Sequence, residues 1–174
     1  RNMVANIEQI SVWLKCDEEQ QEVIVTPLPL YHIFSLTANL LAFVKHGGTN
    51  LLIPNPRDIP AFVKELKKVR FTAMTGVNTL FNALVHNADF RDLDFSSFRL
   101  TVGGGMAVQR AVAERWQEVT GSVIIEGYGL TETSPVVCAN PINASGFSGT
   151  IGLPVPSTEV SIRDDAGEPV GFDE

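Results

Sequence analysis

This chain has few cysteines, a shortage of basic residues and no long hydrophobic run. Its two cysteines, Cys16 and Cys138, lack the close pairing that a metal or redox site shows. A disulfide framework or a zinc site therefore has little support, and a reducing cytosol fits best. The longest apolar stretch, Leu36–Val44, contains polar residues and is far shorter than the ~20 residues that span a bilayer. We therefore expect no transmembrane helix.

The charge of the chain is predominantly negative. It has 13 basic and 20 acidic side chains, which give a formal net charge of -7. Such a chain offers no cationic surface on which a nucleic-acid backbone could release its counterions. We expect no nucleic-acid partner. A phosphate-bearing ligand would need local positive potential from backbone N–H groups, helix N-termini or a metal ion.

The length and hydrophobic content predict one domain-sized unit. With 174 residues and 44% hydrophobic residues, the chain can bury a core, which excludes a disordered linker. Its first residues, Arg1–Ile10, lack the basic-then-apolar order of a signal peptide and resemble a helix entered partway. We expect that the chain begins inside a larger protein.

Hydrophobic patterning predicts an α/β fold. Runs rich in β-branched residues alternate with amphipathic segments about every 25 residues, as in repeated βα units around a parallel sheet. The predicted strands are Glu22–Thr26, Asn50–Ile53, Phe71–Thr75, Phe98–Val102 and Ser122–Glu126. Helices are predicted over Ser35–His46, after an N-cap at Asp58, after Asn78, and from Met106 or Ala107 to a stop at Gly121. The expected fold is an open, mostly parallel sheet flanked by helices.

The pattern changes after Pro135. Gly, Pro, Ser and Asn become frequent, followed by short alternating runs such as Thr158–Ile162 and a turn at Asp164–Gly167. We therefore assign residues 1–134 to the α/β part. Residues 135–174 are expected to form a loop and a separate, short, antiparallel β-rich element.

A triple glycine follows the strand that ends at Val102. Open parallel sheets bind ligands at the carboxyl ends of their strands. There, Gly103, Gly104 and Gly105 remove every Cβ, so a flat group or a chain could lie against bare backbone beside a helix N-terminus. A tight strand-to-helix turn explains the glycines equally well.

The segment Glu126–Thr133 combines several chemical groups after the next strand. Tyr128 stands between two glycines and is suited to stacking on a purine ring. Thr131 offers a hydroxyl to a phosphate oxygen, and Glu132 offers the hard oxygen ligand that Mg²⁺ prefers. Composition alone favours another interpretation, in which Thr131 caps a short helix with Glu132 in its first turn.

The block Tyr128–Thr133 resembles the signature of the acyl-adenylate-forming superfamily, which includes acyl-CoA synthetases, luciferases and peptide-synthetase adenylation domains. As in that family, it follows a strand and comes after the glycine-rich turn. Further blocks resemble the bacterial long-chain fatty acid–CoA ligases over almost the whole chain, namely Pro29–Phe34, Asn55–Pro60, Thr75–Phe81, Leu93–Ser97 and Gly149–Pro156.

This resemblance implies a nucleotide site. By analogy, Thr131 contacts an ATP phosphate, Glu132 coordinates Mg²⁺ and Tyr128 lies against adenine. The resemblance further assigns backbone around Glu126, Gly127 and Gly129 to the nucleotide site and the turn Gly103, Gly104, Gly105 to the space between nucleotide and acyl chain.

The resemblance also implies an acid site. His32 would be catalytic together with Thr131 and Glu132, lining the site near the reacting carboxylate, although a lone histidine before Ile33 is also typical of a core residue. Val77, Asn78 and Phe81 would border the acyl tunnel, or only pack at a helix start.

The implied reaction has two halves. A fatty carboxylate attacks the α-phosphorus of ATP, which releases pyrophosphate and gives acyl-AMP, and the thiol of CoA then displaces AMP. The implied ligands are fatty acid, ATP, Mg²⁺ and CoA. A cytoplasmic location, peripheral association with the inner membrane and homodimer formation are further expectations from the family.

Several family segments do not occur in this chain. It lacks the Ser/Thr/Gly-rich phosphate loop, the Thr-Gly-Asp segment that holds the ribose and the catalytic lysine. We therefore expect the isolated chain to be inactive in both half-reactions. Aryl-CoA ligases and peptide-synthetase adenylation domains share Tyr128–Thr133 and remain alternatives. So does a non-catalytic nucleotide-binding module, although the presence of both Thr131 and Glu132 speaks against it.

Overall fold

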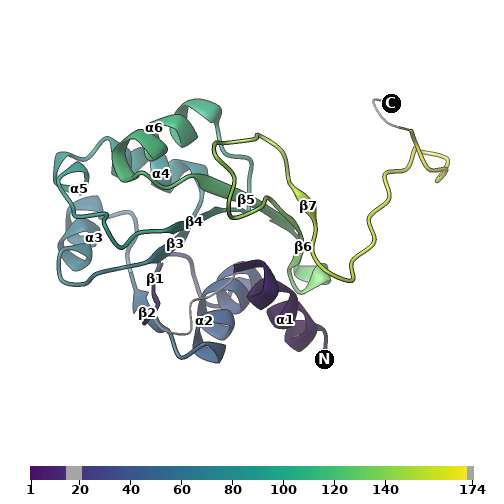
Figure 1. Cartoon of the computed structure of the whole chain (residues 1–174), viewed down its shortest axis with the longest axis horizontal. Coiled ribbons are helices and arrows are strands. Elements are labelled where there is room, and N and C mark those ends of the chain that lie inside the picture. The colour runs from purple at the N-terminus through teal and green to yellow at the C-terminus, as the bar shows by residue number, and fades with distance from the viewer. Residues whose placement is uncertain (15–20, 172–174) are drawn as a thin grey trace.

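A computed structural model describes residues 1–14 and 21–171 (Figure 1). The elements are α1 (Asn2–Leu14), β1 (Val23–Thr26), η1 (Ser35–Leu41), α2 (Ala42–Lys45), β2 (Thr49–Leu52), α3 (Ile59–Leu66), β3 (Ala73–Gly76), α4 (Asn78–Val85), α5 (Ala88–Arg91), β4 (Leu100–Gly103), α6 (Arg110–Thr120), β5 (Ile124–Gly129), η2 (Thr131–Thr133), β6 (Val136–Ala139) and β7 (Leu153–Pro154). Here η1 is a π-helix and η2 a 3₁₀-helix. No described helix is long and apolar enough to cross a membrane.

Within the described residues, the strands form one seven-stranded sheet in the order β2-β1-β3-β4-β5-β6-β7. The first five strands in this order pair in parallel, and the last two pairings are antiparallel. The predicted α/β fold is therefore confirmed. Each of the five predicted strands begins within two residues of its predicted start.

The segment after Pro135 continues this sheet. β6 pairs antiparallel with β5, and β7 pairs antiparallel with β6. The antiparallel direction is confirmed, but the expectation of a separate element is wrong. The physical reason is that the Gly127–Gly129 end of β5 extends beyond its pairing with β4, and its backbone groups find partners when the chain folds back. The domain division at residue 134 stays a prediction.

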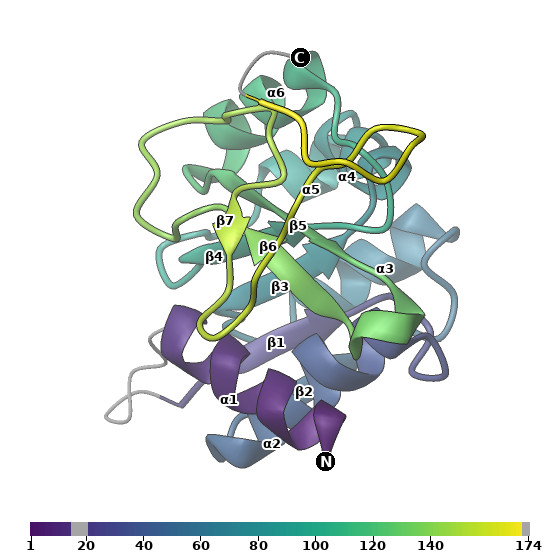
Figure 2. The ribbon, with the colours of Figure 1, turned by 90° about the vertical axis from the view of Figure 1, so that its right-hand side faces the viewer.

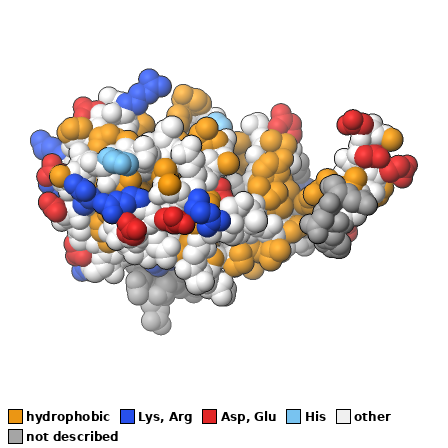
Figure 3. Space-filling model, turned by 90° about the horizontal axis from the view of Figure 1, so that it is seen from above, with side chains coloured by type: hydrophobic (Ala, Val, Ile, Leu, Met, Phe, Trp, Pro, Cys, Tyr) orange, Lys and Arg blue, Asp and Glu red, His pale blue; other side chains and the backbone are white. Residues whose placement is uncertain are grey.

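The C-terminal segment after β7 leaves the body of the molecule in an extended conformation (Figures 1 and 2). Thr158–Ile162 forms no strand, and the predicted turn at Asp164–Gly167 is closed by a hydrogen bond from Gly167 N to Asp164 O (3.0 Å). Acidic side chains gather at its tip (Figure 3). Of the two cysteines, Cys138 is buried as a free thiol, and Cys16 lies outside the described residues.

Helices cover both faces of the sheet (Figures 1 and 2). Strand side chains alternate between the faces, so neighbouring residues belong to different cores. The face carrying Val25 and Met74 packs against α3, α4, α5 and α6. The face carrying Ile24 and Ala73 packs against α1 and α2, and η1 lies in contact with β1 and α1. The second face also forms the wall of the cavity described below.

The helix boundaries follow local signals in two places. Asp58 caps α3 by accepting a hydrogen bond from Ala61 N (3.1 Å), as predicted. Gly121 ends α6 in the left-handed conformation (φ 74°). The start of α6 was predicted wrongly, because the chain stays irregular until Gln109. In this loop the N–H groups of Val108 and Gln109 are taken by side chains of distant residues.

The first predicted crossover helix is also more complex than expected. Ser35–His46 divides into the π-helix η1 and the short α-helix α2. Gly47 follows with a positive φ of 70°, the left-handed conformation in which a glycine ends a helix. The helix expected in the first residues is confirmed as α1, whereas α5 had no predicted counterpart.

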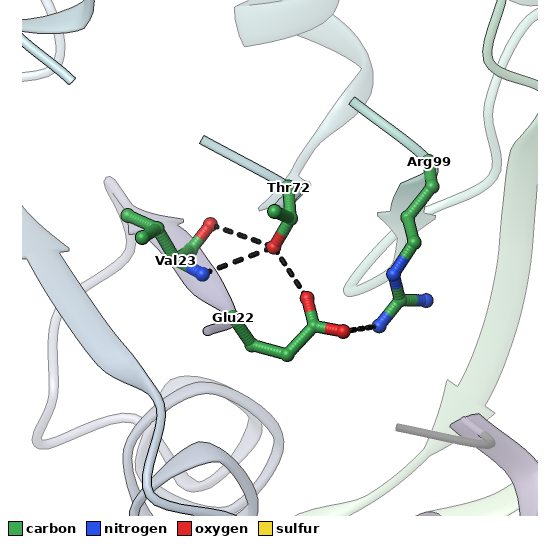
Figure 4. A network of polar contacts seen from close by, with 4 residues as sticks. All are labelled: Glu22, Val23, Thr72 and Arg99. Carbon is green, nitrogen blue, oxygen red and sulfur yellow. Dashed lines mark hydrogen bonds and ion pairs between the residues drawn. The ribbon is translucent and has the colours of Figure 1, made fainter. Parts of the chain in front are cut away.

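The amino ends of three strands are joined by a charged network (Figure 4). Glu22, which precedes β1, accepts hydrogen bonds from Thr72 and from Arg99. Thr72 precedes β3 and also accepts a hydrogen bond from Val23 N (3.0 Å). The Glu22 side chain is only 2% exposed, so the partners compensate a buried charge.

Candidate active site

A cavity of about 300 Å³ lies on the α1 and η1 face of the sheet, toward the carboxyl ends of the strands. Its inner wall is apolar and combines residues of α1 with residues of β1, β3 and β4. These residues are Ile10, Leu14, Ile24, Ala73, Leu100 and Val102. Such a wall suits a hydrocarbon group, because transfer of apolar surface out of water is favourable.

The rim of this cavity contains most of the predicted site residues. The residues that line it are His32, Gly104, Gly105, Gly127, Tyr128, Gly129, Thr131 and Glu132. Tyr128 is 42% exposed and occupies the end of β5. The fold therefore brings the aromatic ring, the hydroxyl and the carboxylate to the same opening, beside the second and third glycines of the turn.

Neither the Thr131 hydroxyl nor the Glu132 carboxylate makes a hydrogen bond or ion pair within the described part of the chain. Both residues are exposed on η2. The helix-cap interpretation of Thr131 is wrong, because Leu130 precedes the 3₁₀ turn. It is the Thr133 hydroxyl that donates to Leu130 O and accepts from Leu130 N, each at 2.9 Å. Thr131 and Glu132 therefore remain available to a ligand.

Gly129 sets the position of this turn. A Cβ atom on Gly129 would lie 2.1 Å from the carbonyl oxygen of Pro135, which is impossible without movement of the backbone. Leu130 N also donates to Pro135 O (3.2 Å). The absence of a side chain at Gly129 thus lets the chain fold back closely and present η2 to the cavity.

The three glycines of the turn serve different purposes. A Cβ on Gly103 would lie 2.9 Å from the side chains of Val108 and Ile124, so this glycine is needed for packing and does not line the cavity. A Cβ on Gly104 would lie 3.0 Å from the Phe34 ring. Gly105 has a positive φ of 78°. Packing accounts for Gly103, the left-handed φ of Gly105 agrees with the tight-turn interpretation, and only Gly104 and Gly105 of the three border the cavity.

Glu126 is another predicted residue outside the cavity wall. Its side-chain Oε1 accepts a hydrogen bond from Val108 N (2.9 Å), which ties β5 to the loop before α6. Its backbone carbonyl accepts a hydrogen bond from Asn140 N (3.0 Å). The side chain is thus engaged within the protein, and the backbone contact to a nucleotide stays a prediction.

His32 lies exposed at the start of the segment that leads into η1. Its ring atom Nδ1 accepts a hydrogen bond from Phe34 N (3.3 Å), which orients the imidazole over the cavity rim. An exposed ring of this kind is no core residue. The position is compatible with contact to a reacting group, and the catalytic role stays a prediction.

The expected acyl-tunnel residues do not line this cavity. Phe81 is fully buried on the opposite face, with its ring centroid 4.8 Å from that of Trp116. Asn78 accepts a hydrogen bond from Gln109 N (2.9 Å) through its side chain. The packing alternative explains both residues.

Sequence reasoning missed the contribution of α1 to the cavity. Trp13 lines the wall, and its indole Nε1 donates to Asn140 O (2.9 Å). Asn140 in turn holds the loop that leads to β7 by donating from Nδ2 to Thr150 O. The apolar spacing of α1 predicted only a helix, because no local motif indicates which strand a helix will cover.

One carboxylate at the rim could take part in metal binding. No group of three or more His, Cys, Asp or Glu side chains suited to a metal ion occurs among residues 1–14 and 21–171. Mg²⁺ does not require such a cage, because it commonly uses one or two carboxylates together with substrate phosphates and water. The unpaired carboxylate of Glu132 fits this kind of site.

The whole chain, residues 1–174, matches the family of AMP-binding enzymes. The chain belongs to this family. Its relatives within the family include long-chain-fatty-acid–CoA ligases. That of Yersinia pestis is 57% identical over 171 residues, and that of Salmonella typhimurium is 59% identical over 166 residues. The alignments cover 98% and 95% of this chain but only 30% of each relative. A Bacillus subtilis relative of the same name is 32% identical over 169 residues, with 97% and 30% coverage.

Solved structures share the fold of this chain. A benzoate CoA ligase from Burkholderia xenovorans LB400 matches with a TM-score of 0.87 and 25% identity, covering 99% of this chain and 35% of that one. An anthranilate CoA ligase in complex with anthranoyl-AMP matches with a TM-score of 0.86 and 24% identity, covering 98% and 33%. The chain thus spans about a third of the length of these proteins.

Proposed function

We propose that the protein to which this chain belongs is a long-chain fatty acid–CoA ligase, which activates fatty acids with ATP and Mg²⁺ to acyl-AMP and transfers the acyl group to CoA. One observation carries the proposal. A single cavity joins an apolar wall to a rim with Tyr128, Thr131 and Glu132. The relatives of the same name at 57% and 59% identity support the choice of a fatty acid as substrate.

The rim residues would bind and orient the nucleotide. In this proposal Tyr128 lies against adenine and Thr131 donates a hydrogen bond to a phosphate oxygen. Gly104 and Gly105 leave room for the fatty carboxylate beside the α-phosphorus. Both reactants are anions, so catalysis consists mainly of positioning and charge neutralisation. Glu132 would hold Mg²⁺, which when bound stabilises negative charge on the phosphate oxygens.

The inner wall would select the acid. A hydrocarbon chain that enters between α1 and the sheet meets Ile10, Leu14 and Leu100, and each buried methylene contributes about 0.8 kcal/mol to binding. This is the physical basis for preferring a fatty acid to a small polar acid. The second half-reaction, displacement of AMP by the CoA thiol, belongs to the same proposal.

The proposal also covers the setting of the enzyme. We assign the full-length protein to the cytoplasm and expect the 174-residue chain alone to form neither acyl-AMP nor the thioester. Peripheral association with the inner membrane and homodimer formation rest on the family resemblance alone.

Replacement of Glu132 by alanine tests the proposal. In the full-length protein, Glu132→Ala is expected to lower hexadecanoate-dependent pyrophosphate exchange by about 10²- to 10³-fold, because one charge-stabilising group is lost. Glu159→Ala is a matched control, since Glu159 is exposed on the extended C-terminal segment away from the cavity. Unchanged exchange in Glu132→Ala would favour a non-catalytic module. A wild-type preference for aromatic or amino acids over hexadecanoate would favour the alternative ligases.

A further inference from the structure

A line of polar side chains starts in the first half of β2, crosses the carboxyl ends of β1 and β3, and ends at the cavity wall. It begins at Asn50 of β2, passes through Thr26 of β1 and Asn39 of η1, and ends at Thr75 of β3. Thr26, Asn39 and Thr75 are 2%, 0% and 1% exposed. Buried polar groups cost free energy unless they are paired, so the direction of each hydrogen bond in this line has consequences.

The direction follows from the orientation of Asn50. Its Nδ2 donates to the backbone carbonyl of Asn39 (3.4 Å), so its Oδ1 faces Thr26. The Thr26 hydroxyl donates to that Oδ1 (2.9 Å), and the Thr26 oxygen then accepts from Asn39 Nδ2 (3.1 Å). Because Nδ2 carries two hydrogens, the second is donated to Thr75 Oγ1 (2.8 Å). Thr75 is therefore an acceptor in this line.

The hydrogen of the Thr75 hydroxyl remains for another partner. A hydroxyl donates one hydrogen bond in addition to those that it accepts. Across residues 1–14 and 21–171, the Thr75 hydroxyl donates to no acceptor, although Thr75 lines the cavity. Within the same residues, Asn39 Oδ1 is also buried without a partner. Of the residues that carry these two groups, only Thr75 lines the cavity, so a ligand there can accept its hydrogen.

Asn39 reaches both threonines from an unusual helix. η1 is a π-helix over Ser35–Leu41. Such turns are rare in proteins as a whole, and those that occur are often found at functional sites. Ser35 at its start donates to Leu28 O (2.9 Å). Ala38, next to Asn39, lines the cavity. The helix is thus bonded to the loop after β1 and to the ends of β1 and β3, directly beside the cavity.

Thr75 lies where the apolar wall meets the rim. Ala73, two residues earlier and about 6.6 Å away along the strand, belongs to the apolar wall. Gly76, which follows Thr75, accepts a hydrogen bond from Gly104 N (3.2 Å), and Gly104 belongs to the rim. An acyl ligand whose hydrocarbon part fills the apolar wall would bring its oxygen atoms to the level of Thr75.

We propose that Asn39 is a positioning residue that holds the Thr75 hydroxyl as a hydrogen-bond donor toward an oxygen atom of the acyl ligand. The inference rests on the proposed fatty acid-activating function. It assigns to Thr75 the recognition of the polar end of the acid and to Asn39 the control of the direction in which Thr75 donates.

Loss of the Thr75 hydroxyl is the first test. In the full-length protein, Thr75→Val is expected to raise the Kd for hexadecanoate about tenfold, whereas Thr75→Ser keeps the donor and stays within about twofold of wild type. Thr37→Val is the matched control. Thr37 is fully buried in η1, the helix that carries Asn39, and its hydroxyl has no partner within the described residues. It does not line the cavity. Its Kd is expected to equal that of wild type.

A double-mutant cycle tests the role of Asn39. Asn39→Leu is expected to raise KM for hexadecanoate about fivefold and to leave KM for ATP unchanged. In a Thr75→Val background the same change should have no further effect on KM for hexadecanoate, because the hydroxyl that Asn39 orients is already absent. An equal loss in both backgrounds would indicate a structural role and overturn the inference.

The outcomes separate this inference from the function on which it rests. Wild-type protein that forms no pyrophosphate with hexadecanoate overturns both proposals. Wild-type activity together with unaltered hexadecanoate binding by Thr75→Val overturns only the inference. Thermal denaturation checks that each variant is folded, and Thr75→Ala replaces Thr75→Val in the same comparison if the valine variant is unfolded.

Discussion

The two ends of the parallel strands differ in whether charged and polar side chains there are paired within the protein. At the amino ends, Glu22, Thr72 and Arg99 bond to one another (Figure 4). At the carboxyl ends, Thr131 and Glu132 face a cavity and have no partner within the described residues. The same sheet thus has one closed polar network and one open set of polar groups.

This difference separates stability from ligand binding. A buried charge with all its partners stabilises the fold only as a complete set, since removal of one partner leaves an uncompensated charge. Unpaired groups at an exposed rim contribute little to stability and can meet a ligand. We therefore expect changes at the amino ends to affect folding and changes at the carboxyl ends to affect activity.

The largest effect on stability is expected from Arg99→Met in the full-length protein. It should lower the free energy of unfolding by about 3 kcal/mol, because the carboxylate of Glu22 is 2% exposed and loses its charged partner. Activity per folded molecule should be unchanged. Denaturant titration measures the effect, with Arg91→Met, an exposed basic residue at the end of α5, as the control. If Arg99→Met lowered kcat without changing stability, the amino ends would serve activity, and the distinction drawn between the two ends would be wrong.

A second change addresses the carboxyl ends. Gly129→Ala places a Cβ where Pro135 O now lies at 2.1 Å, which displaces the turn that carries Thr131 and Glu132. A displacement of this kind is expected to lower pyrophosphate exchange by about 10²-fold. Gly146→Ala is the control, because a Cβ there meets no atom within 4 Å. Comparable activity of the two variants would contradict the role assigned to Gly129.

The smallest expected effect concerns Cys138, which pairs with Tyr128 across β5 and β6. Burial raises the pKa of the Cys138 thiol above its ordinary value. The unfolded thiol ionises first as the pH rises, so the stability contribution is complete below the ordinary pKa and is lost between the ordinary and the raised value.

Cys138→Ala should therefore reduce the alkaline loss of stability. Between pH 8 and pH 10 the free energy of unfolding of wild type should fall more steeply than that of the variant, by at most about 1.4 kcal/mol per pH unit. Urea titrations across this range provide the measurement. Identical slopes would show that Cys138 makes no pH-dependent contribution at the carboxyl end.

Local sequence patterns predicted much of the fold for identifiable reasons. β1 and β3 are buried on both faces and are rich in β-branched or apolar residues, which is the pattern of a central parallel strand. Asp58 and Gly121 mark the ends of their helices through bonds or angles set within a few residues. The start of α6 was missed because its loop is held by Glu126 and Asn78, which are distant in sequence.

The candidate site was predictable where its residues are close together in the sequence. Tyr128, Thr131 and Glu132 are adjacent in the sequence, so their shared position after a strand could be inferred before any coordinates. Gly103 and Glu126 were assigned to the site as well, but their side of the strand end is used for packing and for a hydrogen bond to Val108. Strand register decides which residues at a strand end face a cavity.

The sequence by itself determined the alternation of strands and helices and the chemistry of Glu126–Thr133, because both depend on residues that are neighbours in the chain. Only the tertiary structure decided that α1 covers the cavity, where Trp13 meets Asn140, and that Asn39 bonds to Thr75. Those contacts join residues 127 and 36 positions apart. They depend on how the sheet is ordered and on where each helix packs, which no local pattern specifies.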